Sequence, residues 1–433
     1  MVLKIISIIA APIIITLRNI VNLKHILLLS IVFFTASVSA TNGYFRLGYG
    51  HNSIAMGGTG TALAQDNMAA AINPATIFGI DKTYGVELTL FNPKRGFEVT
   101  GASPMSAQAG EFPLMNGEVR SGSELFVLPS FGYQRAINDQ WAMSLAIYGN
   151  GGMNTDYPAA VFGAGDTGVD LSQLFISTAF AYKATENTTL GFAPIVAVQS
   201  FEARGVGSFA GFSQDAANLS DNGHDTVFGY GARLGITQKL TSSLTLGASY
   251  QTQIDFAEFD KYQGLFAENG DMDIPATYNL GVAFDNADFT VALDYQKINY
   301  SEIASIANPL LPNIMMSALG SDTGAGFGWN DMEVFKLGAA FKQESGVIRA
   351  GISYGEQPID SSEVLFNILA PGVQELHYTA GYEFTLNGEV DYAVTLSYSP
   401  SKSVKGLNPL YQSQQQYIEL DMEQFELTFA CAF

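Results

Sequence analysis

From residue 83 to its end, the sequence repeats one pattern: about ten residues in which large apolar side chains alternate with small or polar ones, and then a break. In the stretch 140–149, for example, every second residue is large and apolar: Trp141, Met143, Leu145 and Ile147. A strict period of two with one apolar face is the signature of a β-strand. A water-soluble β-sandwich shows the same alternation, so the breaks have to distinguish the two architectures.

The breaks alternate between short and long. Short polar turns stand at 136–139, 184–187, 239–243, 284–287, 343–346 and 386–388, and long segments lie near 102–123, 151–172, 201–224, 256–274, 300–331, 356–374 and 399–417. We count fourteen strands, at 83–101, 123–135, 140–150, 173–183, 188–200, 225–238, 243–255, 275–284, 288–299, 332–342, 346–355, 375–385, 389–399 and 418–433. Short turns at one end and long loops at the other are typical of outer-membrane barrels. The sequence therefore predicts an all-β fold, a fourteen-stranded antiparallel transmembrane β-barrel over 83–433.

The composition agrees with a barrel in a membrane. The chain is 47% hydrophobic but only 14% charged, whereas about a quarter of the residues in soluble domains are charged. No stretch after residue 40 is apolar over the roughly 20 residues that a membrane-spanning helix needs. In the last strand, one apolar face ends the chain, formed by Phe425, Leu427, Phe429, Cys431 and Phe433. We expect the barrel assembly machinery of the outer membrane to bind this strand through Phe433, and an edge strand that merely ends the chain is the alternative.

The N-terminus predicts export. Lys24 and His25 precede an apolar core over 26–40 that ends in a small-residue cleavage pattern, which indicates a signal peptide over 1–40. Residues 1–20 hold a short apolar run interrupted by Pro12. We interpret them as sequence upstream of a true translation start near residue 21, and a retained anchor is the alternative.

The charge of the chain after residue 40 excludes one class of partner. This part holds 17 basic and 41 acidic residues, a net charge of −24, and nucleic acid binding needs the opposite sign. The single cysteine, Cys431, excludes an internal disulfide framework.

The chain carries no catalytic or metal-binding motif. His51, His224 and His377 have no metal-ligand spacing among them, and a nucleophile-elbow motif is missing. We therefore expect no enzyme, no cofactor and no metal. A hydrolase that assembles its catalytic residues from separate strands around His377 is a minor alternative.

Residues 41–82 differ from the rest of the chain because they do not alternate and consist largely of Gly, Ala and small polar residues. The stretch MAAAINPA at 68–75 predicts a short helix that Pro74 stops, since proline lacks the backbone donor and clashes with the preceding turn. Fourteen strands enclose a lumen that needs a plug unless it is an open channel. We expect residues 41–82 to lie in the lumen as that plug.

The plug segment resembles a known family. Its sequence NGYFRLGYG…AMGGTGTALAQDNMAAAINPA is similar to the N-terminal hatch of the FadL-type outer-membrane transporters of long-chain fatty acids and hydrocarbons. The likeness continues in YGNGGMNTDY (148–157), DIPATYNLGVAF (273–284), WNDMEVFKLGAAF (329–341) and RAGISYGEQPI (349–359). From here on, we call residues 41–82 the hatch.

The resemblance implies a function and a mechanism. A hydrophobic molecule would be captured outside, would displace the head of the hatch, and would leave sideways through the wall into outer-membrane lipid, without energy input and through a monomer. The residues expected to act in gating are the hatch motif Asn73, Pro74 and Ala75, together with Gly43 and Phe45 at the head of the hatch. A lateral gap needs a kinked strand, and Pro194 in 188–200, where proline removes a ladder hydrogen bond, is a candidate. Pro129 in the second strand is another, and ordinary irregularity of an edge is the alternative for both.

The long loop at 300–331 offers a site for external capture. Its apolar residues are expected to line one short helix that starts near Pro312 and is capped by Gly320: Leu310, Leu311, Ile314, Met315 and Leu319. Exposed apolar patches usually mean binding, and methionines suit ligands of variable shape. The alternative is a loop helix that only packs against its neighbours.

A fatty acid also needs a cation for its carboxylate. The candidates are Arg204 and Lys261 in the loops, and Arg233, Lys336 and Arg349 on the predicted inner faces. The alternative pairs these residues with acids of the lumen in a solvated network, and a shortage of cations would favour uncharged hydrocarbons. Two other functions stay open for such a barrel, a general porin and a surface adhesin or structural barrel.

Overall fold

The computed structural model describes residues 42–106, 111–386 and 388–433. The expected signal peptide over 1–40 lies outside the described residues. No helix in the described ranges is long and apolar enough to cross a membrane.

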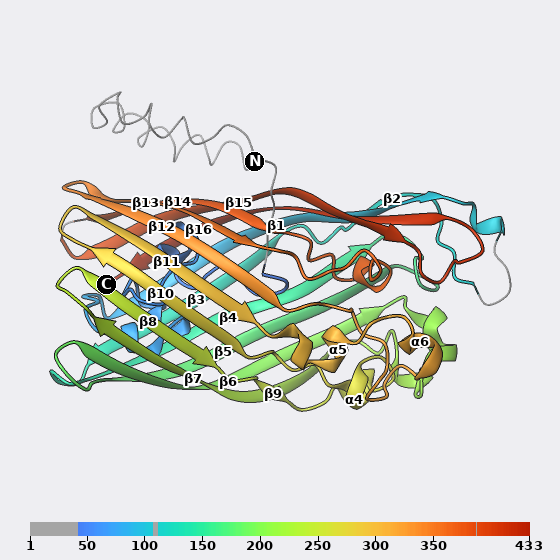
Figure 1. Ribbon diagram of the computed structural model, residues 1–433, viewed down its shortest axis with the longest axis horizontal. Coiled ribbons are helices and arrows are strands. Elements are labelled where there is room, and N and C mark those ends of the chain that lie inside the picture. Colours follow the sequence, from blue (N-terminus) through green and yellow to red (C-terminus); the bar gives the residue numbers. More distant parts are fainter. Residues whose placement is uncertain (1–41, 107–110, 387) are drawn as a thin grey trace, which may run out of the picture. The chain divides into compact units, whose positions relative to one another are not determined.

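Fourteen long strands form the wall of a closed antiparallel β-barrel (Figure 1). They are β1 (Tyr84–Gly101), β3 (Phe126–Ala136), β4 (Trp141–Tyr157), β5 (Thr167–Lys183), β6 (Thr188–Arg204), β7 (Asp225–Lys239), β8 (Leu244–Gln251), β10 (Thr277–Asp285), β11 (Phe289–Ile298), β12 (Met332–Gln343), β13 (Gly346–Gly355), β14 (Leu376–Leu386), β15 (Val390–Leu407) and β16 (Gln416–Ala432). Each pairs with its neighbour in chain order, and β16 pairs with β1 from Ala432–Gly85 to Gln416–Gly101, which closes the barrel. The predicted architecture and strand number are confirmed.

Two short strands lengthen the wall without adding to its circumference. β2 (Gly117–Arg120) pairs only with the outer end of β1, and β9 (Asp255–Phe256) pairs with β7 beyond the end of β8. The long loops lie at the end of the barrel that carries these extensions, on the right in Figure 1, and the short turns lie at the other end. In an outer-membrane barrel the long loops are extracellular.

Several strands reach further out than the alternation of apolar residues predicts. Residues 151–172 were expected as loop, but β4 runs to Tyr157 and β5 starts at Thr167. That expectation is wrong because the outer ends of these strands stand above the lipid, where their outward face need not be apolar. Within β4 the inward alternation continues, since Met153, Thr155 and Tyr157 are all buried.

The helical elements are short. Those of the external loops are α4 (Ala267–Gly270), α5 (Ala304–Ala307), α6 (Asn313–Met316) and the 3-10 turns η3 (Pro104–Ser106), η4 (Gly207–Phe212), η5 (Ala216–Asn218), η6 (Asp260–Tyr262), η7 (Tyr300–Glu302) and η8 (Phe366–Ile368). Aromatic rings from four of these loops pack together, with centroids 5.0–6.1 Å apart: Phe112, Phe162, Phe209 and Phe366. The largest apolar core of the described chain therefore lies between the hatch and the external loops.

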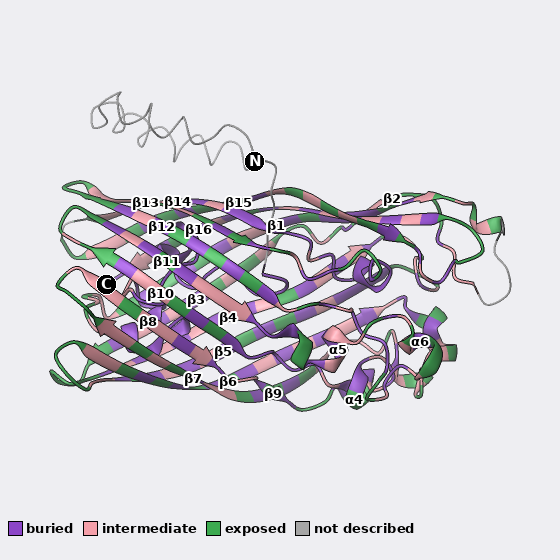
Figure 2. Ribbon diagram, viewed as in Figure 1, coloured by how far each residue is buried: buried purple, intermediate pink, exposed green. Residues whose placement is uncertain are grey.

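The two faces of the wall differ as the alternation predicts (Figure 2). Leu280, Leu293 and Phe335 point outward and are more than half exposed in the absence of lipid, whereas inward residues such as Ser144 and Thr428 are fully buried. The wall thus presents apolar side chains to the membrane and small or polar side chains to the lumen.

The hatch fills the lumen, and nearly all residues from 42 to 77 are buried (Figure 2). It contains α3 (His51–Ala55) and two 3-10 turns, η1 (Ala69–Ala71) and η2 (Pro74–Thr76). The expected short helix stopped by Pro74 is wrong in detail. Pro74 instead begins η2, because the first turn of a helix needs no backbone donor at that position.

Candidate functional site

Glycines of the wall hold the backbone of the hatch. A Cβ atom at Gly235 would overlap Asn73, one at Gly191 would overlap the peptide of Pro74 and Ala75, and one at Gly351 would overlap Gly57. The wall glycines that a hatch residue approaches in this way are Gly85, Gly132, Gly151, Gly191, Gly235, Gly247, Gly281, Gly338, Gly351 and Gly381. Their strands run all round the barrel, so the hatch rests on a ring of wall positions that lack side chains.

Asn73 joins the hatch to this wall. Its Nδ2 donates to the carbonyl oxygens of Thr61 at 2.7 Å, Ile236 at 3.2 Å and Ala248 at 3.3 Å, and its Oδ1 accepts from the backbone N–H of Ala75 at 2.9 Å. Ile236 and Ala248 belong to β7 and β8. One side chain therefore caps η2 and also fixes it to two strands.

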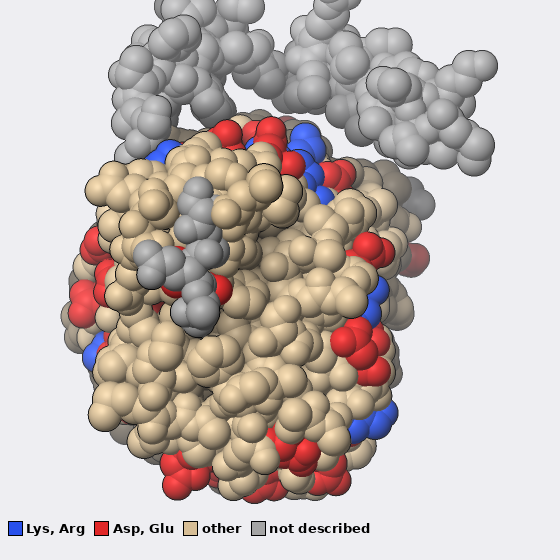
Figure 3. All heavy atoms as spheres, turned by 90° about the vertical axis from the view of Figure 1, so that its right-hand side faces the viewer, with Lys and Arg blue, Asp and Glu red and all other residues tan. Residues whose placement is uncertain are grey.

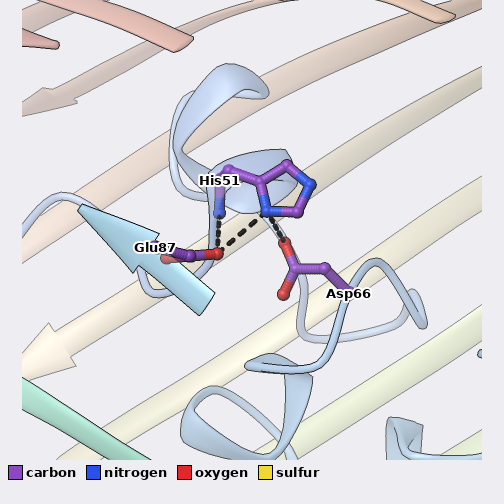
Figure 4. A group of neighbouring side chains, drawn as sticks. All are labelled: His51, Asp66 and Glu87. Carbon is purple, nitrogen blue, oxygen red and sulfur yellow. Dashed lines mark hydrogen bonds and ion pairs between the residues drawn. The ribbon is translucent and has the colours of Figure 1, made fainter. Parts of the chain in front are cut away.

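A buried ionic cluster fixes the middle of the hatch to the wall (Figure 4). His51 Nδ1 lies 2.9 Å from Glu87 Oε1 on β1 and 3.6 Å from Asp66 Oδ2 in the hatch, and His51 Nε2 lies 3.1 Å from Glu383 Oε2 on β14. Burial alone would lower the pKa of His51, but the hydrogen bonds to Glu383 and Glu87 and the charge of Asp66 outweigh it and raise this pKa to about 10.

Two aromatic residues of the external loop between β11 and β12 hold the head of the hatch. The Tyr300 hydroxyl donates to the carbonyl oxygen of Asn42 at 2.6 Å, and the ring of Tyr44 lies 5.3 Å from that of Tyr300 and 5.9 Å from that of Trp329. Gly43 has a φ of +63°, and a Cβ there would overlap the Tyr300 hydroxyl. The predicted head residues Gly43 and Phe45 thus lie in an aromatic clamp made with Tyr300 and Trp329.

The wall has an opening between β3 and β4. The two strands pair only from Ala136–Ala142 to Phe131–Ile147, although both continue outward from there. A β-bulge between Gly149 and Gly151 shifts the register of β4 against β5 at this level. Bulges bend a strand and interrupt its pairing, so the outer parts of β3 and β4 diverge.

A cavity of about 190 Å³ lies at this opening. Its lining comes from the head of the hatch, from both sides of the opening and from the external loops, and includes Tyr44, Phe126, Leu128, Met153 and Leu369. The cavity therefore connects the clamp at the head of the hatch with the divergent strands of the wall.

Two buried arginines line the same cavity. Arg46 of the hatch lies 3.5 Å from Glu426 Oε2, and its Nε has no hydrogen-bond partner among the described residues. Arg95 of β1 is 6% exposed, lies 5.6 Å from the ring centre of Phe126, and donates to the carbonyl oxygens of Pro93 and Asn154. In the described part of the chain, no carboxylate oxygen lies within 4.0 Å of the Arg95 guanidinium.

The sequence model of the family described as "Outer membrane protein transport protein (OMPP1/FadL/TodX)" matches residues 48–426. The chain belongs to this family. It is therefore a protein of the Gram-negative outer membrane and belongs to a family of transporters of hydrophobic substrates, as the resemblance implied.

Solved structures of FadL/TodX-type proteins share the fold. The Pseudomonas putida toluene transporter TodX is 20% identical with a TM-score of 0.62, over 89% of this chain and 99% of TodX. A Pseudomonas aeruginosa FadL homologue is 17% identical with a TM-score of 0.60, over 92% of this chain and 99% of the homologue. The Ralstonia pickettii toluene transporter TbuX is 18% identical with a TM-score of 0.56, over 89% of this chain and 99% of TbuX. Such identities establish the fold alone. No curated protein matches the sequence.

The predicted carboxylate partners of this FadL/TodX-family protein have other contacts. Arg204, expected in a loop, is the last residue of β6 and lies 3.0 Å from Asp156 of β4, and the Lys261 ammonium donates to the carbonyl oxygen of His224 at 2.6 Å in the external loops. Arg233, Lys336 and Arg349 face the lumen as expected, but they hold the hatch or its supports: they contact the carbonyl oxygens of Ala70 and Leu47 and the carboxylate of Glu383. None of the five lines the cavity at the opening, and as ligand partners they stay predictions.

The predicted capture segment is divided between core and surface. Leu310, Ile314 and Leu319 are buried, whereas Met315 is 55% and the adjacent Met316 78% exposed. Leu311 is partly buried, and α6 begins after Pro312, as expected, but ends at Met316, well before Gly320. The centre of the loop end of the FadL/TodX-family barrel is mostly uncharged, and its charged side chains lie at the rim (Figure 3).

Pro194 lies in β6 opposite Ala232 of β7, and the register between these strands continues through it. Its role as a kink stays a prediction. The residues that sequence reasoning missed are Arg46, Arg95, Tyr300 and Trp329. The inward position of Arg95 could have been predicted, because Arg95 is an even number of residues away from the inward Glu87 and Thr89 of its strand.

Proposed function

We propose that this protein takes up hydrophobic molecules with an anionic or strongly polar head, such as long-chain fatty acids, and releases them sideways into the outer membrane. The molecule is captured at the uncharged centre of the external loops, displaces the head of the hatch, and leaves through the opening between β3 and β4. The observation that carries this proposal is the cavity at that opening, where apolar side chains and glycines are lined up with two arginines, while the one acidic residue of the lining, Glu426, is paired with Arg46.

The chemistry of Arg95 favours a substrate with a head group. Burial of a charge without a partner is costly, and a buried ion is normally paired. Among the described residues, Arg95 donates only to backbone carbonyl oxygens and lies near an aromatic ring, and the carboxylate of Glu124 acts on it without forming an ion pair. A carboxylate bound between Arg95 and the free Nε of Arg46 would supply charge-assisted hydrogen bonds. An uncharged hydrocarbon would leave both groups as they are.

The experiment compares two substrates in two variants. We expect Arg95→Met to lower uptake of a long-chain fatty acid roughly ten- to hundredfold, because a hydrogen bond to a charged group contributes about 1.5–3 kcal/mol. Uptake of an alkane of equal length should stay unchanged. Uptake is measured with labelled substrate in cells that lack other carriers, and Lys405→Met, a cation at the exposed rim, is the control.

Comparing the two substrates also distinguishes recognition of the head group from a general role of Arg95 in the path. Equal loss of both substrates in Arg95→Met would contradict head-group recognition, and unchanged uptake of the fatty acid would contradict any role of Arg95 in the path.

A further inference from the structure

His51, Asp66 and Glu87 place one imidazole nitrogen and two carboxylates around one point inside the barrel (Figure 4). The Nδ1 atom of His51 lies 2.9 Å from Glu87 Oε1 and 3.6 Å from Asp66 Oδ2. Metal–nitrogen and metal–oxygen bonds of about 2.0–2.2 Å place neighbouring ligand atoms about 3.0–3.5 Å apart. Small side-chain shifts would therefore let all three atoms bind one ion.

The imidazole has the support that a metal ligand needs. Metal-binding histidines almost always donate their second ring N–H to a carboxylate or carbonyl, which fixes the tautomer and the ring orientation. His51 Nε2 lies 3.1 Å from Glu383 Oε2. Glu383 is itself held by the Asn52 side chain at 2.9 Å and by Arg349 at 3.3 Å.

The two carboxylates are oriented in the same way. Asp66 accepts from the backbone N–H groups of Asn52 and Met68, both at 2.9 Å. Glu87 Oε1 accepts from the backbone N–H of His51 at 2.8 Å. All three candidate ligands are thus positioned by contacts outside the point where they converge.

An unpartnered oxygen points independently to a missing ligand. Glu87 is 7% exposed, and its Oε2 has no hydrogen-bond partner among the described residues. A buried carboxylate oxygen without a partner loses the full free energy of its hydration. A cation bound by Glu87 would compensate that loss.

We propose that His51, Asp66 and Glu87 form a binding site for one divalent transition-metal ion, such as Zn²⁺ or Mn²⁺. Mixed imidazole and carboxylate donors suit this class of ions. Because His51 and Asp66 belong to the hatch and Glu87 to β1, the ion fastens the hatch to the wall. Glu383 is a positioning residue that acts through His51. The site does not depend on which molecule the barrel carries.

The test titrates untagged, full-length protein in detergent, stripped with a chelator, with ZnCl₂ and with MnCl₂ in a calorimeter. We expect one ion per chain for at least one of the two metals and a loss of more than about a hundredfold in affinity in His51→Gln. Glu383→Gln should keep the stoichiometry and bind roughly ten- to hundredfold more weakly. The matched control is His224→Gln, because His224 also lies near two carboxylates, Asp170 at 3.1 Å and Glu202 at 3.7 Å, but at the outer surface. This variant should bind as the wild type does.

Two results would overturn the proposal: folded wild-type protein that binds neither metal, and binding that survives in His51→Gln but is lost in His224→Gln. If His51→Gln fails to give a folded, heat-modifiable barrel, anomalous diffraction from wild-type crystals grown with the metal decides. A peak in bonding distance of His51 Nδ1 supports the site, and an ion bound only elsewhere refutes it.

Discussion

Asn73 shows how much one side chain can do at the boundary between the hatch and the wall. Replacing Asn73 and Pro74 together with alanine removes three donated hydrogen bonds and the cap of η2. Each buried carbonyl left unsatisfied costs about 1–3 kcal/mol, and this loss falls on the hatch because the strand ladders do not use Asn73. We expect the barrel to assemble and uptake to change.

Assembly of this double variant is followed by heat-modifiable mobility, and uptake by growth on long-chain fatty acids or alkanes. Asn138→Ala, in a short turn where Asn138 Oδ1 accepts from two backbone N–H groups, is the control that should leave uptake unchanged. Normal growth of the double variant would contradict a gating role of the hatch motif.

A second residue, Asp271, makes an external loop sensitive to pH. Burial and the adjacent charge of Asp273 raise the pKa of Asp271 to about 8, from an ordinary value of 3.8. The folded loop therefore holds this proton more tightly than the unfolded chain does. Its contribution to loop stability is fully present below about pH 4 and is lost as the pH rises through about 8.

Limited proteolysis of the 257–274 loop at several pH values measures this effect. We expect cleavage to become faster above pH 8 in the wild type and to depend much less on pH in Asp271→Asn. Asp260→Asn, in the same loop, should behave as the wild type does; an identical pH profile in Asp271→Asn would rule out this carboxyl as the cause.

At this scale, sequence reasoning found the faces of residues but not their partners. The alternation of inward and outward residues along each strand correctly placed Arg233, Lys336 and Arg349 on the inner face. Their contacts with the hatch depend on loops and turns, which that alternation does not describe. The same limit applies to His51, Asp66 and Glu87. They come from separate segments of the chain and therefore show no local spacing typical of metal ligands. For this reason the sequence alone predicted no metal.

Among the elements, the strands were the most predictable. Alternation and turn length gave fourteen strands with inner ends close to those observed, because a lipid-facing strand must be apolar on every second residue. The outer ends of β4, β5 and β15 were missed where the lipid ends and this requirement ceases. The opening was also missed, because it depends on pairing between β3 and β4 and on a bulge among Gly149, Asn150 and Gly151.

The opening gives a prediction about a pair of strands. In a Cys431→Ser background, cysteines at Leu128 and Met153 stand on β3 and β4 at the cavity. A bifunctional thiol reagent that joins them should stop uptake, because the strands can no longer separate around a substrate, and a cleavable reagent should restore uptake after reduction.

The control pair for this experiment joins Val282 and Leu246, which face each other in an intact ladder of β10 and β8. That cross-link should have no effect. Uptake at the wild-type rate through a barrel cross-linked between positions 128 and 153 would exclude this exit.

The whole molecule combines a closed wall with a plug that is not one of the wall strands, although Phe45 of the plug forms an antiparallel bridge with Gly151 of β4. Each strand from β1 round to β16 pairs with both of its neighbours in the wall without residues 42–82. We therefore expect a protein that lacks 42–82 to form a barrel whose conductance in a planar bilayer exceeds that of the intact protein by roughly tenfold or more, since fourteen strands enclose a wide lumen. Equal conductance of the two proteins would show that the loops, not the hatch, close the bore.

The ring of wall glycines that receives the hatch limits how such a carrier can be redesigned. At Gly191, Gly247 and Gly351 even one methyl group would collide with the backbone of the plug, so a mutant library directed at these wall positions would yield mainly misassembled protein. Selectivity can be altered more freely where side chains already differ in size and charge, among the external loops and beside Arg95. To obtain a carrier for a new substrate, the wall glycines should be kept, and residues of the external loops and of the opening between β3 and β4 should be randomised.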